Sequence, residues 1–236
     1  MAPRETPLAN LLDHKSSEPR VTPLDLFALA RKKWLAGERL DIGRLAAELE
    51  VSRATAFRWV GSRELLYGEL LSQDFVEAFA AARAAARGTG TRYVAQVARY
   101  LMTLVLESAP LRSFIDRDRD FAMRVLLSSD SPVERRCVAA VEEALAEQVA
   151  AGEIAPAMDL HSLAYVIVRI AESFMYRDVI TGERPDIEAA ITAIRILVES
   201  RAEAAKKAPA PSTRRKKTQP RARRTPTGRR RSPAQR

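Results

Sequence analysis

The chain has 236 residues, of which 47% are hydrophobic, so it can form one large or two small domains around a sizeable core. Its single cysteine, Cys137, excludes an internal disulfide framework and any metal site built from several cysteines. No segment reaches the roughly 18 uncharged apolar residues of a membrane span, and the first residues lack the apolar stretch of a signal peptide. We therefore expect a cytoplasmic protein that has no membrane partner.

The net charge of +9 comes from one end of the chain. Of the 39 lysines and arginines, 13 lie in residues 206–236, which contain no acid, so the other residues hold 26 bases against 30 acids. This segment has five prolines and no large apolar side chain, which predicts a disordered tail. Such a tail can attract DNA without sequence preference, or it can serve only for solubility. The tail residues expected to contact DNA are Arg214, Arg215, Lys216, Lys217, Arg221, Arg223, Arg224, Arg229, Arg230 and Arg231.

Between a disordered arm at residues 1–21 and this tail, the hydrophobic pattern predicts an all-α protein. The first helix begins with Thr22 as its N-cap, has proline at the first helical position and ends at a glycine. Asp41, Ser52 and Ser62 are expected to cap the next three helices. Further helices are expected over residues 63–87, 91–108, 110–129 (divided near Asp118), 132–152, 159–182 and 185–207.

The third helix, which runs to Val60, has residues suited to reading a DNA groove on one side. At about 100° per residue, Ala56 and Val60 share the inner side, while Ala54 and Arg58 lie almost opposite. Ala54 permits close approach to a partner, Arg58 can bind a guanine edge with two hydrogen bonds, and Thr55 offers a hydroxyl or a methyl group. The same pattern also fits an ordinary solvated helix.

Phosphate contacts are expected from residues near helix N-termini, where unpaired amides add positive potential. Ser52, Thr55 and Arg63 occupy such positions. A short helix pair joined by a tight turn, supported by the helix before it, is helix-turn-helix architecture.

Residues 40–71, LDIGRLAAELEVSRATAFRWVGSRELLYGELL, resemble the DNA-binding region of TetR-family transcriptional regulators. The shared features are an Ala-Ala pair before the turn, Val-Ser at the start of the recognition helix, a threonine and an aromatic residue within it, and a Ser-Lys-Glu-like step into the next helix. In this chain they are Ala46-Ala47, Val51-Ser52, Thr55, Phe57 and Ser62-Arg63-Glu64.

The chain departs from the family pattern at three positions. Glu50 stands where the family usually has a glycine in the turn, so the same turn would need a left-handed glutamate. Phe57 replaces a frequent tyrosine and keeps only the packing part of its role. Arg63 replaces the usual lysine and keeps its charge.

The resemblance implies a helix-turn-helix domain over residues 22–72 and a helical ligand-binding and dimerisation domain over residues 73–205. It implies a homodimer, formed through the last two long helices, that binds a pseudo-palindromic operator in double-stranded DNA. It also implies that the protein is a repressor, which a small, mainly apolar effector releases from DNA. The second domain resembles the subset with a QsdR-type C-terminal domain, associated with regulation of quorum-signal or lactone degradation. The residues implied to face bases are Arg53, Ala54, Thr55 and Arg58, and those implied to face the DNA backbone are Ser52, Phe57, Trp59 and Arg63.

A ligand pocket is expected among the middle helices. Arg169 and Glu172 lie three residues apart within a strongly apolar segment, where a charge needs a partner. They can pair with each other or across a dimer seam, or Arg169 or Tyr165 can bind the polar head of a ligand. The residues expected to line the pocket are Phe121, Met123, Tyr165, Arg169, Glu172, Phe174 and Met175, although aromatic and methionine residues at this spacing are often plain core.

An enzyme is not expected, and neither is a metal or a cofactor. The chain has two histidines, His14 and His161, and no glycine-rich phosphate loop or HExxH pair. The alternative that remains is a nucleoid-associated architectural protein whose DNA binding depends on the basic tail and has little sequence preference.

Overall fold

The structure is a computed structural model that describes residues 21–128 and 131–199. Within these ranges all regular secondary structure is helical, as the sequence predicted. The expected basic tail and all but the last residue of the expected N-terminal arm lie outside the described residues. The helices are α2 (Pro23–Leu35), α3 (Ile42–Glu48), α4 (Arg53–Val60), α5 (Arg63–Ala85), α6 (Gly90–Glu107), α7 (Ala109–Arg117), α8 (Arg119–Leu127), α9 (Val133–Ala150), α10 (Leu160–Met175), α11 (Arg177–Ile180) and α12 (Ile187–Glu199).

The first four of these helices begin where local side chains satisfy free backbone amides. Thr22 accepts a hydrogen bond from the Asp25 amide, and the Asp25 carboxylate accepts one from the Thr22 amide, which completes a capping box at α2. Asp41, Ser52 and Ser62 cap α3, α4 and α5 in the same way, each accepting from the amide three residues later. The predicted caps of all four helices are therefore confirmed.

The turn before α4 contains the strained residue that the sequence indicated. Glu50 has φ 55°, and it is the one non-glycine residue with positive φ among those described. A left-handed conformation brings the Cβ atom of an L-residue close to the following carbonyl, which is why glycine is preferred there. The turn after α4 also has a residue with positive φ, Gly61, at φ 75° and ψ −75°.

The ends of α5 and α10 differ from the sequence prediction. α5 ends at Ala85 rather than at residue 87, because the Arg87 guanidinium folds back and donates to the carbonyls of Ala84, Ala85 and Ala86. The segment expected to be a single helix over residues 159–182 is broken at Tyr176, after which only the four-residue α11 follows. Tyr176 is buried, and the amide of Asp186 satisfies the carbonyl of Phe174 at the break.

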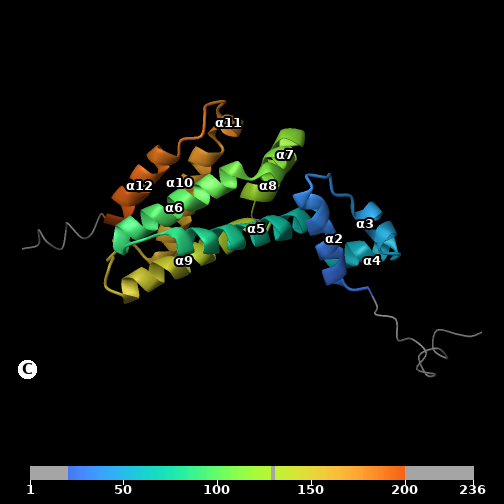
Figure 1. The fold of residues 1–236 in the computed structure, drawn as a ribbon, viewed down its shortest axis with the longest axis horizontal. Helices are drawn as coiled ribbons and strands as arrows, with labels where there is room; N and C mark the ends of the chain where they lie inside the picture. Colours follow the sequence, from blue (N-terminus) through green and yellow to red (C-terminus); the bar gives the residue numbers. More distant parts are fainter. Residues whose placement is uncertain (1–20, 129–130, 200–236) are drawn as a thin grey trace, which may run out of the picture.

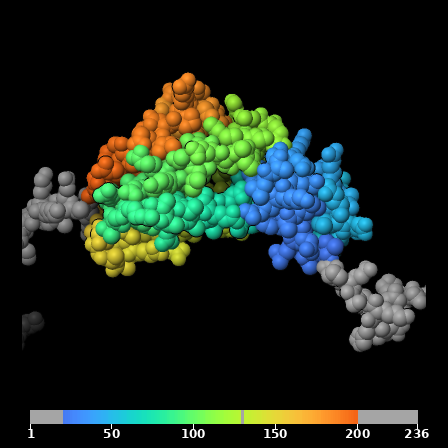
Figure 2. Space-filling view, viewed as in Figure 1, coloured from blue at the N-terminus to red at the C-terminus, as the bar shows by residue number. Residues whose placement is uncertain are grey.

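The molecule is elongated, with α2, α3 and α4 packed together at one end (Figures 1 and 2). α5 starts at this end and extends along the remaining helices (Figure 1). In the larger part, α5, α6, α12, α10 and α9 contact one another in that cyclic order, so they enclose a central space. α5 also passes very close to the start of α9, where a Cβ atom on Gly68 would lie 2.6 Å from Cδ of Pro132.

An aromatic cluster joins the two parts of the molecule. It consists of Trp34 on α2, Tyr67 on α5, Phe114 on α7 and Phe121 on α8, all of which are buried. The Tyr67 and Phe114 rings stack at 4.6 Å between centroids, and Trp34 meets both rings edge to face. The Tyr67 hydroxyl accepts a hydrogen bond of 3.0 Å from the amide of Leu40, just before α3. The position of α2 and α3 is thus tied to α7 and α8 through Tyr67.

Candidate nucleic-acid interface and ligand cavity

Helix α4 has one buried and one solvent-facing side, in the orientation that its sequence predicts. Ala56 is fully buried and Val60 is half-buried against α2 and α3, whereas Arg53, Ala54 and Arg58 are exposed. The exposed side carries two guanidinium groups separated by a small residue, which leaves room for a close partner surface.

The other residues expected at DNA are partly occupied by contacts within the chain. The Ser52 hydroxyl accepts from the Thr55 amide at 3.0 Å and lies 2.9 Å from the Thr55 hydroxyl, so one hydroxyl proton of this pair stays available to a phosphate. Phe57 is 36% exposed, and the Arg53 guanidinium lies over its ring at 5.4 Å. Trp59 is half-buried and packs against the core.

Arg63 faces the aromatic cluster as well as the surface. Its guanidinium lies 4.1 Å from the centroid of the Phe121 ring and 5.4 Å from that of Tyr67. Its Nε atom is buried and has no hydrogen-bond partner. Arg63 is therefore held by ring faces at the junction of α5 and α8, a contact that the sequence pattern did not indicate.

A surface depression beside α4 adds two basic residues that the sequence analysis missed. Its lining includes Arg39, Arg44, Arg53 and Arg63, with Asp41 as its acid. The Arg44 amide donates to the Asp41 carboxylate at 2.9 Å, and this bond, together with the nearby Arg44 and Arg53 charges, holds the pKa of Asp41 below its usual range. Asp41 therefore stays ionised at neutral pH, and its negative charge lies among the positive charges of the arginines that line the depression. Arg39 and Arg44 flank the N-cap of α3, and only the fold places them next to α4.

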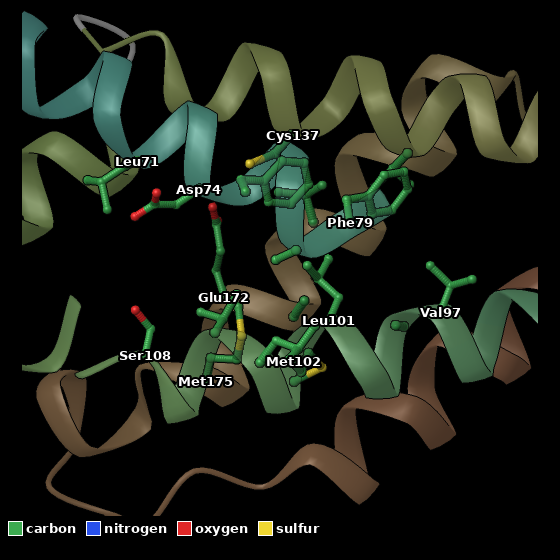
Figure 3. Close-up of a pocket in the computed structure, with 18 of the residues that line it drawn as sticks. Leu71, Asp74, Phe79, Val97, Leu101, Met102, Ser108, Cys137, Glu172 and Met175 are labelled. Atoms are coloured by element: carbon green, nitrogen blue, oxygen red, sulfur yellow. The ribbon is translucent and has the colours of Figure 1, made fainter. Parts of the chain in front are cut away.

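The ring of long helices encloses an apolar cavity of about 450 Å³ (Figure 3). Its wall is mainly aliphatic and aromatic, and a volume of this size is typical of small-molecule sites. Residues of α2, α7 and α8 complete the lining, so the cavity reaches the helix that supports the helix-turn-helix unit. In Figure 3 Asp74 lies beside Leu71, and the carboxylate end of Glu172 is directed toward Asp74.

Two of the residues that the sequence analysis expected to line a ligand pocket lie in the wall of this cavity. Glu172 and Met175 line this cavity, but the other five residues named from the sequence do not. Phe121 belongs to the aromatic cluster, and Met123 is half-buried elsewhere on α8. Tyr165 is 43% exposed, with Arg169 over its ring, and Phe174 lies under the Arg177 guanidinium.

Helix α10 is apolar on more than one side, so its sequence does not indicate which side faces the cavity. Val168, Ala171, Glu172 and Met175 face the cavity, whereas the Tyr165 and Arg169 positions lie on the adjoining side of the helix. The expected pairing of Arg169 with Glu172 is present, at 3.0 Å from Nη2 to Oε2. Arg169 also lies 3.6 Å from Glu134 on α9.

The carboxyl groups of the cavity have perturbed pKa values. Burial raises the pKa of Glu172 to about 7, the charge of Glu134 adds to this effect, and Arg169 opposes it. Burial also raises the pKa of Asp74, although its Oδ2 atom accepts a hydrogen bond of 2.6 Å from the Trp34 indole. The Cys137 thiol is buried in the wall, and its pKa is raised by burial, so it stays a neutral thiol.

Within residues 21–128 and 131–199, no three His, Cys, Asp or Glu side chains are grouped so that they could hold a metal ion. No helix in the described part of the chain is long and apolar enough to cross a membrane.

The chain is similar to known transcriptional regulators. Residues 89–199 match the family model described as the tetracyclin repressor-like C-terminal domain. The structure of the R. erythropolis transcriptional repressor QsdR from the TetR family aligns with a TM-score of 0.72 and 30% identity, over 75% of this chain and 93% of that chain. A TetR family transcriptional regulator, PfmR from Thermus thermophilus, aligns over 74% of this chain and 97% of that chain, with 16% identity and a TM-score of only 0.38. No curated protein matches the sequence.

Proposed function

The chain belongs to the TetR family of transcriptional regulators, and we propose that it is a homodimeric repressor that binds a pseudo-palindromic operator and leaves it when a small, mainly apolar effector enters the cavity. Regulators of this family are not enzymes, in agreement with the sequence prediction. Its place of action would be the nucleoid. QsdR is itself described as a transcriptional repressor, which supports the direction of regulation proposed here.

The observation that carries the proposal is the exposed side of α4. Arg53, Ala54 and Arg58 lie on it, while Ala56 is fully buried behind them. We assign base contacts to the exposed residues and to Thr55, and phosphate contacts to Ser52, Phe57, Trp59 and Arg63. Arg39 and Arg44 would add phosphate contacts at the neighbouring depression. The basic tail would add affinity without specificity.

A dimer formed through α10 and α12 would place two copies of α4 in successive major grooves, about 34 Å apart. The cavity reaches Arg31 and Leu35 on α2, so an effector inside it would touch the helix that supports α3 and α4. An effector that binds better to a conformer with the wrong spacing shifts the population away from DNA.

The test is selection of bound DNA from a random pool at near-physiological salt. The full chain should recover one pseudo-palindrome, and Arg58→Ala should recover it with weaker binding and without the preference at one base position of each half-site. Arg92→Ala, which removes an exposed arginine from α6, is the matched control and should recover the same sequence as the wild type. A chain that ends at residue 205 should select the same sequence with weaker binding.

One result would reject this function, and a second would reject the assignment of Arg58. If the full chain binds every sequence alike, the helix-turn-helix does not read DNA and the tail-driven architectural role replaces it. If Arg58→Ala selects the same pseudo-palindrome as the wild type, with the preference at every base position unchanged, the base contacts are made by other residues.

A further inference from the structure

The wall of the cavity has too few positive charges for its carboxylates, and this imbalance occurs in two places. At the first, Arg169 is shared between Glu172 on its own helix and Glu134 on α9, at 3.0 and 3.6 Å. One guanidinium therefore faces two carboxylates. When both are ionised, a negative charge is left over beside the cavity.

The second place lies at the end of the cavity near α2. Here Arg31 is shared between Asp74, at 3.8 Å, and Glu77, at 2.6 Å. The remaining donor to Asp74 is the Trp34 indole, which is neutral. Among the described residues that line the cavity, Arg31 is the base, and the acids are Asp74, Glu77 and Glu172.

Glu172 is the carboxylate best placed to receive a ligand. Its side chain is only 12% exposed, it lines the cavity, and its Oε2 atom has no partner in hydrogen-bond geometry although Arg169 is near. A buried acceptor without a hydrogen bond is costly to leave in that state. Asp74 accepts a hydrogen bond of 2.6 Å from Trp34. Glu172 accepts a longer one, 3.3 Å, from Arg169 at Oε1, which leaves its Oε2 atom without a donor.

We propose that the effector of this cavity is a lipophilic organic cation, whose ammonium or amidinium group pairs with Glu172 while its apolar body fills the space between α5, α6 and α9. The inference rests on the proposed function, because it names the chemical class of the effector at the same site. Phe75, Phe79 and Tyr93 are among the lining residues, and an aromatic ring that turns its face to a cation attracts it further.

Four probes test the class: three carry a ten-carbon chain with a cationic, neutral or anionic head, and the fourth is a neutral lactone of ten carbons. They are decyltrimethylammonium, decan-1-ol, decanoate and the neutral γ-decalactone, each titrated below its aggregation limit into the full chain by calorimetry. Decyltrimethylammonium should bind at least tenfold more tightly than either neutral probe, and decanoate should bind most weakly. Equal affinity for the cation and the neutral probes, or tightest binding of decanoate or the lactone, would overturn the proposal.

The variant Glu172→Gln keeps the shape of the side chain and removes its charge. It should reduce the affinity for decyltrimethylammonium at least tenfold and leave the affinity for decan-1-ol within about twofold. Glu143→Gln, on the exposed side of α9, is the matched control and should bind like the wild type. An unchanged cation affinity in Glu172→Gln would reject Glu172 as the anchor.

The pH gives an independent test, because the quaternary ammonium group does not titrate. The groups around Glu172 are Arg169 on α10, Glu134 and Cys137 on α9, Tyr176 at the end of α10, and Asp74 on α5 across the cavity. Since Glu172 ionises near pH 7, cation affinity should rise between pH 6 and pH 8 in the wild type and stay flat in Glu172→Gln. The same rise in both proteins would contradict the proposal.

The effector class and the regulator function can be disproved independently of each other. Calorimetry without DNA tests the effector class alone, and selection from a DNA pool tests the regulator alone. A protein that selects an operator but discriminates against the cation disproves only the inference. A protein that prefers the cation but selects no DNA sequence disproves only the proposed function.

Discussion

The guanidinium of Arg63 lies 4.1 Å from the centroid of the Phe121 ring. Arg63 is the first residue of α5, directly after α4, and Phe121 lies on α8 in the larger part of the molecule. Through Phe121, Arg63 also meets the cluster that contains Trp34, whose indole binds the cavity residue Asp74. The end of the recognition helix and the wall of the cavity are therefore connected by a short chain of direct contacts.

A double-mutant cycle tests whether the contact of Arg63 with Phe121 stabilises the junction. Arg63→Lys keeps the charge but loses the planar group, and Phe121→Leu removes the ring from a buried site. The cycle should give a coupling energy of about 0.5–2 kcal/mol in the free energy of unfolding, measured by urea denaturation. Pairing Arg58→Lys with Phe121→Leu serves as the control and should be additive. Additivity in both cycles would mean that the stacking has no energetic role.

The strained turn before α4 gives a second prediction. A left-handed conformation costs an L-residue roughly 1–2 kcal/mol, and the greater freedom of an unfolded glycine offsets about 0.5–1 kcal/mol of that. Glu50→Gly should therefore raise the free energy of unfolding by about 0.5–1 kcal/mol. Ala47→Gly, in the exposed side of α3, should lower it by about 1 kcal/mol. If Glu50→Gly were as destabilising as Ala47→Gly, the turn would not be left-handed at this residue.

Features that depend on neighbouring residues could be predicted from the sequence, whereas the cavity could not. The caps at Thr22, Asp41 and Ser52 involve residues three positions apart, so their spacing alone identifies them. The inner position of Ala56 follows from helical periodicity for the same reason. The cavity, however, is formed where α5, α6, α9, α10 and α12 meet and α2, α7 and α8 close it, and no periodicity indicates which side of α10 turns toward it. The sequence analysis expected both Tyr165 and Glu172 to line the pocket, but of these two only Glu172 faces the cavity.

The basic depression beside α4 predicts two classes of DNA-binding variant. Arg44→Ala should weaken binding to operator and unrelated DNA alike, and it should reduce the slope of log affinity against log salt by about 0.9. Arg58→Ala should instead cost about 1–3 kcal/mol on the operator and relax the preference at one base position. Affinity measured for both sequences at several salt concentrations separates the two effects. Loss of specificity in Arg44→Ala would show that Arg44 contacts a base.

The buried carboxyl of Glu172 predicts a pH dependence of stability. Its pKa is raised from 4.5 to about 7 in the folded chain, mainly by burial. The folded state therefore binds this proton more tightly than the unfolded state. Its contribution to stability is fully present below about pH 4.5 and is lost as the pH rises toward 7.

Glu172→Gln should remove this contribution. Between pH 5 and pH 7, the free energy of unfolding of the wild type should fall relative to that of the variant, with a limiting slope of about 1.4 kcal/mol per pH unit. Urea denaturation of both proteins at several pH values measures the difference. Glu143→Gln, from an exposed position, should run parallel to the wild type. Parallel curves for Glu172→Gln as well would mean that Glu172 is ionised throughout this range.

The proposed dimer surface can be tested at Ile196 on α12, which is 65% exposed in the single chain. Burying an isoleucine that is exposed in the monomer contributes about 1.5–3 kcal/mol to association, and a lysine there would bring an unpaired charge into the seam. Ile196→Lys should therefore shift the protein from dimer to monomer in light scattering over a concentration series. Ile180→Lys, at a 57% exposed site on α11 outside the proposed seam, should remain dimeric. If Ile196→Lys stays dimeric and Ile180→Lys dissociates, the two-fold seam lies at α11 instead, and the spacing of the two α4 helices must be derived from that interface.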